Sequence, residues 1–242
     1  MMDGSRSRVN VRLTGSGGQG IALAATVLAE AALDTGLYAT MLQEYGPEAR
    51  GGATKADLSV ARLPIANPQF QVPDLCLVIS DKAWTRFGQE LIGRKDVALV
   101  TDRDRVVVPG VGDPAEMGII SLPFDEAAKL RIGAKVVANM ICAASLARLI
   151  EAIPLDGVAK VAERRSPAAF KDKNRQATQL GWQMMDEYLS VHVLPWRTSE
   201  GEVGVLAAGG DVAIAGVGAL GAGSGAGEGW SHEGGGRSAL RP

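Results

Sequence analysis

The sequence predicts an α/β fold: a three-layer, Rossmann-like domain with a parallel or mixed sheet between helices, followed by a disordered Gly-rich C-terminal tail. Three observations support this prediction. A strand pattern, a glycine loop and a helix pattern follow one another in residues 9–33. Short continuous apolar runs, such as 75–79, are typical of strands buried on both faces of a sheet. Beyond residue 198, Gly, Ala and Ser dominate, and too few large apolar side chains remain to offset the entropy of ordering.

The first strand, loop and helix form the unit around which the chain is organised. Val9, Val11 and Leu13 alternate with polar residues, as in a strand, and Gly15-Ser-Gly-Gly-Gln-Gly20 follows directly. Ile21–Leu33 is rich in Ala and Leu and contains no helix breaker. Glycines let a backbone approach a ligand closely, and the first turn of a helix offers free N–H groups to an anion. The alternative is that these glycines only let the helix pack closely on the strand.

The rest of the chain continues the α/β pattern. Further strands are expected at 37–42, 53–61, 75–79, 97–101 and 119–122, with another short one at 105–108. Further helices are expected at 82–91 with Ser80 as N-cap, from 124 with an interruption at Gly133, and at 135–153, 156–165 and 168–189. We therefore expect one folded domain at 8–195 and a tail at 198–242.

Composition excludes several classes of function. The 242 residues carry a formal net charge of −2, which argues against a nucleic-acid partner held by bulk electrostatics. The two cysteines, Cys76 and Cys142, each sit in an apolar run and are expected to be buried. They cannot hold an iron–sulfur cluster alone, and they form no disulfide framework, as suits a cytoplasmic protein. We expect no signal peptide, because the N-terminal stretch 1–8 is short and polar, and no membrane span, because no apolar run approaches about 18 residues. No catalytic or metal-ligating residue is assigned.

A second irregular segment, Gln43-Glu-Tyr-Gly-Pro-Glu-Ala-Arg-Gly-Gly52, follows the second expected strand. It gathers Glu44, Tyr45, Glu48 and Arg50 in one loop. One interpretation is a solvated turn; the other is a loop that borders a ligand or a partner subunit, because loops carry function disproportionately.

Together, the two glycine-rich segments resemble the gamma subunit of 2-oxoacid:ferredoxin oxidoreductases, and the segment Gly133 to Asn139-Met140 is also similar to that family. The resemblance covers about 8–190, and Tyr45-Gly-Pro-Glu-Ala-Arg-Gly-Gly52 is closer to the 2-oxoglutarate or branched-chain members than to the pyruvate ones. It implies a complex with alpha and beta subunits and, in some complexes, delta. Those subunits would hold thiamine diphosphate, magnesium and iron–sulfur clusters.

The implied reaction is oxidative decarboxylation of a 2-oxoacid, here 2-oxoglutarate, to an acyl-CoA, with electrons passed to ferredoxin. The gamma subunit would not be catalytic alone but would help to enclose coenzyme A. The carboxyl ends of strands line the ligand crevice of an open α/β sheet. The residues expected to bind the cofactor are therefore Gly15, Gly17, Gly18, Gln19, Gly20, Arg50, Gly51 and Gly52. Those expected to form a partner or active-site loop are Glu44, Tyr45, Gly46, Pro47 and Glu48.

Two other classes stay open on the residues alone. A free-standing NAD-dependent dehydrogenase would use the glycine fingerprint, with Glu44 near the place of a ribose-binding acid. Against it, the core offers no catalytic histidine, since His192 falls late in the chain. The other is a non-catalytic nucleotide-binding module.

Overall fold

The computed structural model describes residues 7–44, 52–108 and 114–192. The chain divides into two compact units, 1–210 and 211–242, and every described residue belongs to the first. The predicted tail at 198–242 and the predicted boundary after 195 lie outside the described residues, so both stay predictions.

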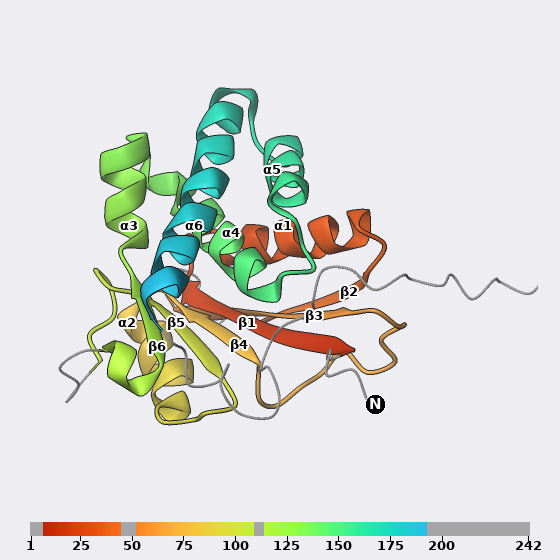
Figure 1. Cartoon of the computed structure of the whole chain (residues 1–242), viewed down its shortest axis with the longest axis vertical. Coiled ribbons are helices and arrows are strands. Elements are labelled where there is room, and N and C mark those ends of the chain that lie inside the picture. The colour runs from red at the N-terminus through yellow and green to blue at the C-terminus, as the bar shows by residue number, and fades with distance from the viewer. Residues whose placement is uncertain (1–6, 45–51, 109–113, 193–242) are drawn as a thin grey trace, which may run out of the picture. The chain divides into compact units, whose positions relative to one another are not determined.

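A six-stranded mixed sheet forms the centre of the described residues (Figure 1). Its strand order is β2-β3-β1-β4-β5-β6. The strands are β1 (Arg8–Ser16), β2 (Tyr38–Glu44), β3 (Ala53–Ala61), β4 (Leu75–Val78), β5 (Ala98–Asp102) and β6 (Ile119–Leu122). β1, β4, β5 and β6 are parallel, whereas β3 runs antiparallel to both β1 and β2.

The antiparallel strand β3 occupies the position beside β1. In a dinucleotide-binding fold, the strand that follows the first helix lies there and runs parallel to the first strand. Here that strand, β2, is displaced to the edge of the sheet. The mixed sheet is therefore as predicted, but its order departs from the fold that the NAD-dependent dehydrogenase alternative requires.

Helices cover both faces of the sheet, as the predicted three-layer class requires. α1 (Ile21–Asp34), α4 (Ala138–Ile150), α5 (Leu155–Arg164) and α6 (Lys171–Val191) lie on one face (Figure 1). The other face is covered over β4 and β5 by α2 (Asp81–Ala83), which continues as a helical run to Leu91. Shorter helical segments are α3 (Phe124–Ala127), which extends to Ile132, and single turns at 114–117, 135–137 and 168–170.

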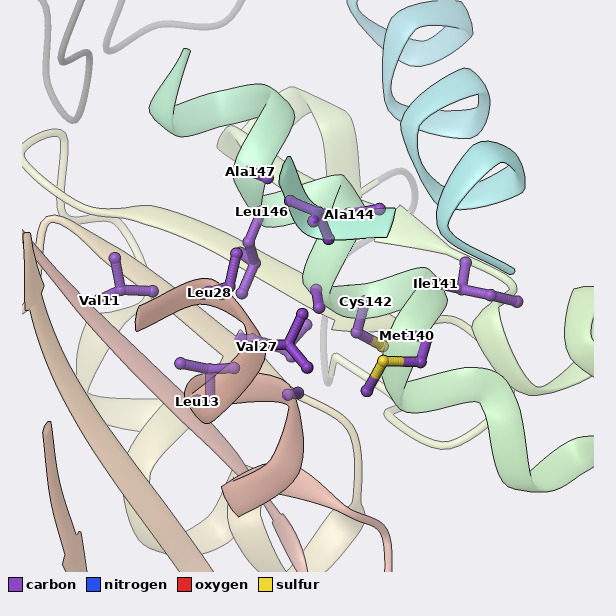
Figure 2. Close-up of a cluster of buried hydrophobic side chains, with 14 of the residues drawn as sticks. Val11, Leu13, Val27, Leu28, Met140, Ile141, Cys142, Ala144, Leu146 and Ala147 are labelled. Carbon is purple, nitrogen blue, oxygen red and sulfur yellow. The ribbon is translucent and has the colours of Figure 1, made fainter. Parts of the chain in front are cut away.

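The larger apolar core lies between the sheet and the helices α1 and α4. Figure 2 shows Val11 and Leu13 of β1 directed toward Val27 and Leu28 of α1. β4 contributes to both faces, because Leu75 and Leu77 enter this core whereas Cys76 and Val78 enter the smaller core under α2. This double burial explains the continuous apolar run in the sequence.

Helices α4 and α6 cross at very short range. A Cβ atom added at Gly181 would lie 2.1 Å from the carbonyl oxygen of Ile141. The Ser145 hydroxyl on α4 donates to the carbonyl oxygen of Gly181 at 2.7 Å. Only glycine can occupy position 181 without separating the two helices.

On the face opposite α1, β1 and β3 carry a buried ion pair. Arg12 and Asp57 lie opposite each other in the register. The guanidinium donates from Nε and Nη2 to the two carboxylate oxygens at 2.8 and 2.9 Å. Its carbon lies 5.3 Å from the ring centroid of Phe70. Both charged side chains are buried, so each depends on the other for compensation.

Several local predictions are confirmed. Ser80 caps the helical run at 81–91, since its hydroxyl accepts from the N–H of Ala83 at 3.2 Å. Gly133 ends the extension of α3 with φ of 70°. Both cysteines are buried.

The strand expected at 105–108 is wrong. The N–H groups of Arg105 and Val106 both donate to the carbonyl oxygen of Asp102, which makes a turn, and Val106 packs into the smaller core. The helix expected at 135–153 ends at Ile150, because Glu151 adopts φ of 59°. Among the described residues, no helix combines the length and apolar character needed to cross a bilayer.

Candidate functional site

The glycine loop joins the carboxyl end of β1 to the first turn of α1. Gly18 and Gly20 adopt φ of 92° and 75°, a backbone region that favours glycine. A Cβ atom at Gly20 would lie 2.3 Å from Nδ2 of Asn139, whose amide donates to the carbonyl oxygen of Gly20 at 3.3 Å. The loop is thus held against the start of α4.

Gln19 stabilises this loop. Its Oε1 accepts from the N–H of Ser16 at 2.5 Å, and its Nε2 donates to the carbonyl oxygen of Ile79 at 3.1 Å. Both atoms of the amide therefore bind backbone. Gln19, which was expected to bind the cofactor, thus fixes the loop to the end of β4.

The two glycine-rich segments meet at the end of the sheet where β1 stops and β3 begins. The N–H of Gly17 donates to the carbonyl oxygen of Gly52 at 3.0 Å, and the Thr54 hydroxyl donates to that of Gly15 at 3.3 Å. Their expected proximity is confirmed for these residues. The remaining predicted site residues Tyr45, Gly46, Pro47, Glu48, Arg50 and Gly51 lie outside the described residues.

A cavity of about 650 Å³ opens beside the glycine loop. Arg105, Asp125 and Lys135 line it opposite the loop. Asp125 accepts from the guanidinium of Arg105, and the ammonium of Lys135 lies 3.4 Å from the same carboxylate oxygen. Two cations share one carboxylate, so this wall carries a net positive charge and favours an anionic group.

Two smaller cavities lie near the start of β3, and one of them adjoins the glycine loop. One of about 320 Å³ shares Gly17, Gly18 and Gly20 and adds Gln43 and Lys55. Gln43 and Lys55 also line a third cavity of about 470 Å³. The third cavity is also lined by Asp57 and Phe70, on the face opposite α1, whereas the 320 Å³ cavity is bordered by Ile21 and Leu23 of α1.

Glu44 lines this third cavity. Lys55 lies 3.0 Å and Arg86 3.4 Å from its carboxylate oxygens. The hydrogen bond from Lys55 and the nearby positive charge lower the pKa of Glu44. Arg50 lies outside the described residues, and two described cations, Lys55 and Arg86, hold the carboxylate of Glu44.

Sequence reasoning missed Arg105, Asp125, Lys135 and Asn139 as site residues. They come from three separate segments that the fold brings to the mouth of the cavity. No local motif connects them, so no spacing in the sequence could have indicated their proximity.

Comparison with known proteins identifies the group to which this fold belongs. A family profile described as "Pyruvate ferredoxin/flavodoxin oxidoreductase" matches residues 10–184. The chain belongs to this family. The 2-oxoglutarate synthase subunit KorC of Methanothermobacter thermautotrophicus is 33% identical over 184 residues, covering 74% of this chain and 96% of the relative. KorC of Archaeoglobus fulgidus is 34% identical over 176 residues, covering 73% of this chain and 87% of the relative.

A solved structure agrees with this membership. The gamma subunit of a keto/oxoacid ferredoxin oxidoreductase from Geobacter sulfurreducens has a TM-score of 0.62 at 26% identity. The match covers 78% of this chain and 100% of that chain. The resemblance to the gamma subunit is confirmed, and the chain is a KorC-like subunit within the pyruvate ferredoxin/flavodoxin oxidoreductase family.

Each cysteine of this family member is a buried core residue, Cys142 in the larger core and Cys76 in the smaller one. Burial raises the pKa of Cys76 to about 12 and raises that of Cys142 well above its usual value. Among the residues that the structure describes, no cluster of three or more His, Cys, Asp or Glu side chains is placed to hold a metal ion.

Asp102 is a buried carboxyl group that supports the wall of the cavity. Its two oxygens accept from the N–H groups of Asp104 at 2.9 Å and Asp125 at 3.2 Å, which fixes the first turn of α3. Burial, together with the nearby carboxylates of Asp125 and Asp104, raises its pKa to about 6, although the two N–H donors oppose this shift. Asp102 thus positions Asp125 but destabilises the fold when ionised.

The free energy of unfolding should fall between pH 4 and pH 6 because of Asp102. A folded-state pKa of about 6 lies above the ordinary value of 3.8, so the folded chain binds this proton more tightly than the unfolded chain. The stability contribution is present below pH 4 and is lost as pH rises through 6, by about 3 kcal/mol. In the Asp102→Asn variant, the free energy of unfolding, measured by urea denaturation at each pH, should fall by about 3 kcal/mol less than in the wild type between pH 4 and pH 6. Asp156→Asn, which changes an exposed carboxylate in α5, is the control, and an equal fall in wild type and Asp102→Asn would contradict the assignment.

Proposed function

We propose that this chain is the gamma subunit of a thiamine-diphosphate-dependent 2-oxoglutarate:ferredoxin oxidoreductase of the cytoplasm. The complex converts a 2-oxoacid to an acyl-CoA by oxidative decarboxylation and passes the electrons to ferredoxin. The preference for 2-oxoglutarate rests on identity: KorC subunits reach 33%, whereas pyruvate synthase subunit PorC of Methanothermobacter marburgensis reaches 26%.

The described residues fit some of the groups that such a complex uses and not others. Two buried thiols with raised pKa values do not fit an iron–sulfur cluster. Thiamine diphosphate, magnesium and the clusters are therefore assigned to alpha, beta and any delta subunits. The cationic cavity beside the glycine loop does fit the anionic part of coenzyme A.

One observation carries the proposal. The hydrogen bond from Gly17 to Gly52 brings both glycine-rich segments to the carboxyl end of β1, beside the cavity lined by Arg105 and Lys135. Side-chain-poor backbone and two cations at a single opening suit a phosphate group that a companion subunit then encloses.

This chain's residues bind and orient and do not react. The first turn of α1 presents N–H groups that have no partner within the helix. Arg105 supplies a planar set of donors suited to phosphate, and Lys135 adds a point charge. Asp125 holds both cations in place, and Asp102 holds Asp125. Arg50, from the second loop, is the further donor proposed from the sequence.

The proposal predicts a selective loss of affinity for coenzyme A. In the assembled complex, Arg105→Ala and Lys135→Ala should each raise the KM for coenzyme A about tenfold, because a lost charge-assisted hydrogen bond costs about 1.5 kcal/mol. Arg50→Ala tests the second loop in the same assay. The KM for 2-oxoglutarate should not change. Arg94→Ala is the control, because Arg94 is exposed and pairs locally with Asp96.

Unchanged KM values for coenzyme A in all three variants would exclude the cavity beside the glycine loop as the coenzyme A site. Co-purification with thiamine-dependent subunits, and turnover of 2-oxoglutarate rather than pyruvate, test the assignment of the complex. Tight NADH binding with hydride transfer by the isolated chain would instead favour the dehydrogenase, and nucleotide binding without companions would favour the non-catalytic module.

A further inference from the structure

Asn139 carries a buried amide at the edge of the cavity beside the glycine loop. The residue lies near the start of α4, is 6% exposed and lines this cavity. Its Nδ2 donates to the carbonyl oxygen of Gly20 at 3.3 Å. Burying an amide costs free energy that its hydrogen bond has to compensate. The carbonyl that it binds indicates what this amide controls.

The Gly20 carbonyl is the acceptor that begins the hydrogen bonds of α1. It also accepts from the N–H of Ala24 at 3.0 Å, so it lies along the axis of the helix. A peptide unit is planar, and its C=O and N–H groups point in opposite directions. The N–H of Ile21, which belongs to the same unit, therefore points out of the N-terminal end of α1. An amide that fixes the carbonyl also fixes the direction of this donor.

The N-terminal end of α1 carries no side-chain cap. Its N-cap is Gly20, which has no side chain, and the first turn contains no acidic residue. A Ser, Thr, Asp or Asn at this position would accept from the N–H of the second or third helical residue and occupy it. Glycine leaves these donors open to an anion, at the positive end of the helix dipole. Their orientation then has to be fixed by other residues, and Asn139 supplies such a contact.

Helix α4 gives Asn139 a rigid base. Residues 138–147 of this helix are all buried. At the crossing with α6, a Cβ atom at Gly181 would lie 2.1 Å from the carbonyl oxygen of Ile141, two residues beyond Asn139. A helix packed this closely cannot shift to follow the loop, so the amide holds the Gly20 carbonyl at a fixed place.

The same stretch of chain carries one of the cations of the cavity. Lys135 lies four residues before Asn139, in the single helical turn 135–137 that leads into α4. Lys135 lines the cavity, and its ammonium is 3.4 Å from the carboxylate of Asp125. The hydrogen bond between Asn139 and Gly20 thus sets the separation between the backbone donors of α1 and this positive charge.

We propose that Asn139 is a positioning residue for coenzyme A binding. Its amide holds the peptide unit of Gly20 and Ile21 so that the N–H of Ile21 and the ammonium of Lys135 bind the same anionic group. Asn139 acts through the loop and not by contact with coenzyme A. This inference rests on the proposed function.

The test is Asn139→Ala in the assembled complex. Calorimetric titration with coenzyme A, in the absence of 2-oxoacid, should give a Kd about fivefold higher than that of wild type, the change expected for one lost neutral hydrogen bond. In turnover, the KM for coenzyme A should rise by a similar factor, whereas kcat and the KM for 2-oxoglutarate should not change. A residue that only stabilised the fold would not produce this split.

Asn174→Ala is the matched control. Asn174 is 7% exposed, lies near the start of α6 and donates through its Nδ2 to the hydroxyl oxygen of Ser166. It does not line the cavity beside the glycine loop. Both variants lose a buried amide, so both should lower the melting temperature, but only Asn139→Ala should raise the Kd for coenzyme A. Equal changes of Kd in the two variants would overturn the proposal, because lost stability would then explain the weaker binding.

Gly20→Ala tests the contact itself. Its added Cβ would lie 2.3 Å from Nδ2 of Asn139 and would push the amide away from the carbonyl. Asn139→Ala should therefore raise the Kd for coenzyme A in the wild-type chain but not further in the Gly20→Ala chain. If the two effects on Kd multiplied independently, Asn139 would not act through Gly20.

The outcomes separate this inference from the proposed function. If Arg105→Ala and Lys135→Ala raise the Kd for coenzyme A and Asn139→Ala does not, the positioning role is overturned while the site stands. If none of these three variants changes the Kd, the cavity is not the coenzyme A site and both proposals are overturned.

Discussion

Replacing Gly181 with alanine is expected to lower the free energy of unfolding by about 3 kcal/mol, the upper part of the range for overpacking a tight core. The added Cβ would lie 2.1 Å from the carbonyl oxygen of Ile141, which is backbone and cannot turn aside. The helix-propensity gain of about 1 kcal/mol for alanine over glycine is too small to compensate. Urea denaturation of the isolated chain measures the change.

Gly157→Ala is the matched control, because it makes the same chemical change in helix α5. There the nearest atom to the added Cβ, Cγ of Pro154, is 3.6 Å away, which is an ordinary contact. Without a clash, alanine should raise stability by about 0.5–1 kcal/mol. If both variants gained stability, the close crossing of α4 and α6 would not exist in solution.

The second large effect concerns the buried ion pair. Asp57→Ala should cost about 3–5 kcal/mol, because it leaves the guanidinium of Arg12 buried without its carboxylate. Replacing both members with leucine should recover much of this loss, since no uncompensated charge then remains. Chemical denaturation at neutral pH distinguishes the single variant from the double variant.

The exposed pair of Arg94 and Asp96 provides the comparison. It has similar two-point geometry, with distances of 3.0 and 2.6 Å, but both side chains reach solvent. Asp96→Ala should therefore cost less than about 1 kcal/mol. Equal losses for Asp57→Ala and Asp96→Ala would show that burial does not determine the strength of the Arg12 pair.

Much of the local structure could be predicted from residue pattern. The alternation in 53–61 predicted β3 with the observed bounds, and the hydroxyl of Ser80 caps the helix as expected. The apolar run at 75–79 correctly indicated a strand with two buried faces. These features depend on near neighbours in the sequence, so the sequence contains them.

The strand order, and the wall that Arg105 and Lys135 form in the cavity beside the glycine loop, both depend on contacts between distant residues. β3 has an ordinary strand pattern, and nothing in that pattern says that it lies between β1 and β2. Arg105 belongs to a segment mistaken for a strand, because Val106 and its neighbours are apolar for packing and not for sheet pairing. Lys135 enters the site only because Asn139 and Gly20 bring the start of α4 to the loop. Tertiary contacts, not propensity, make the site.

The placement of β3 also bears on how such enzymes diversify. Both ends of the connection between β2 and β3 are tied, Glu44 to Lys55 and Gly52 to Gly17. Each doubling of a loop's length costs only about 0.6 kcal/mol in closure entropy. Insertions and deletions between these two contacts are thus inexpensive, so the length of this connection can change without redesigning the sheet.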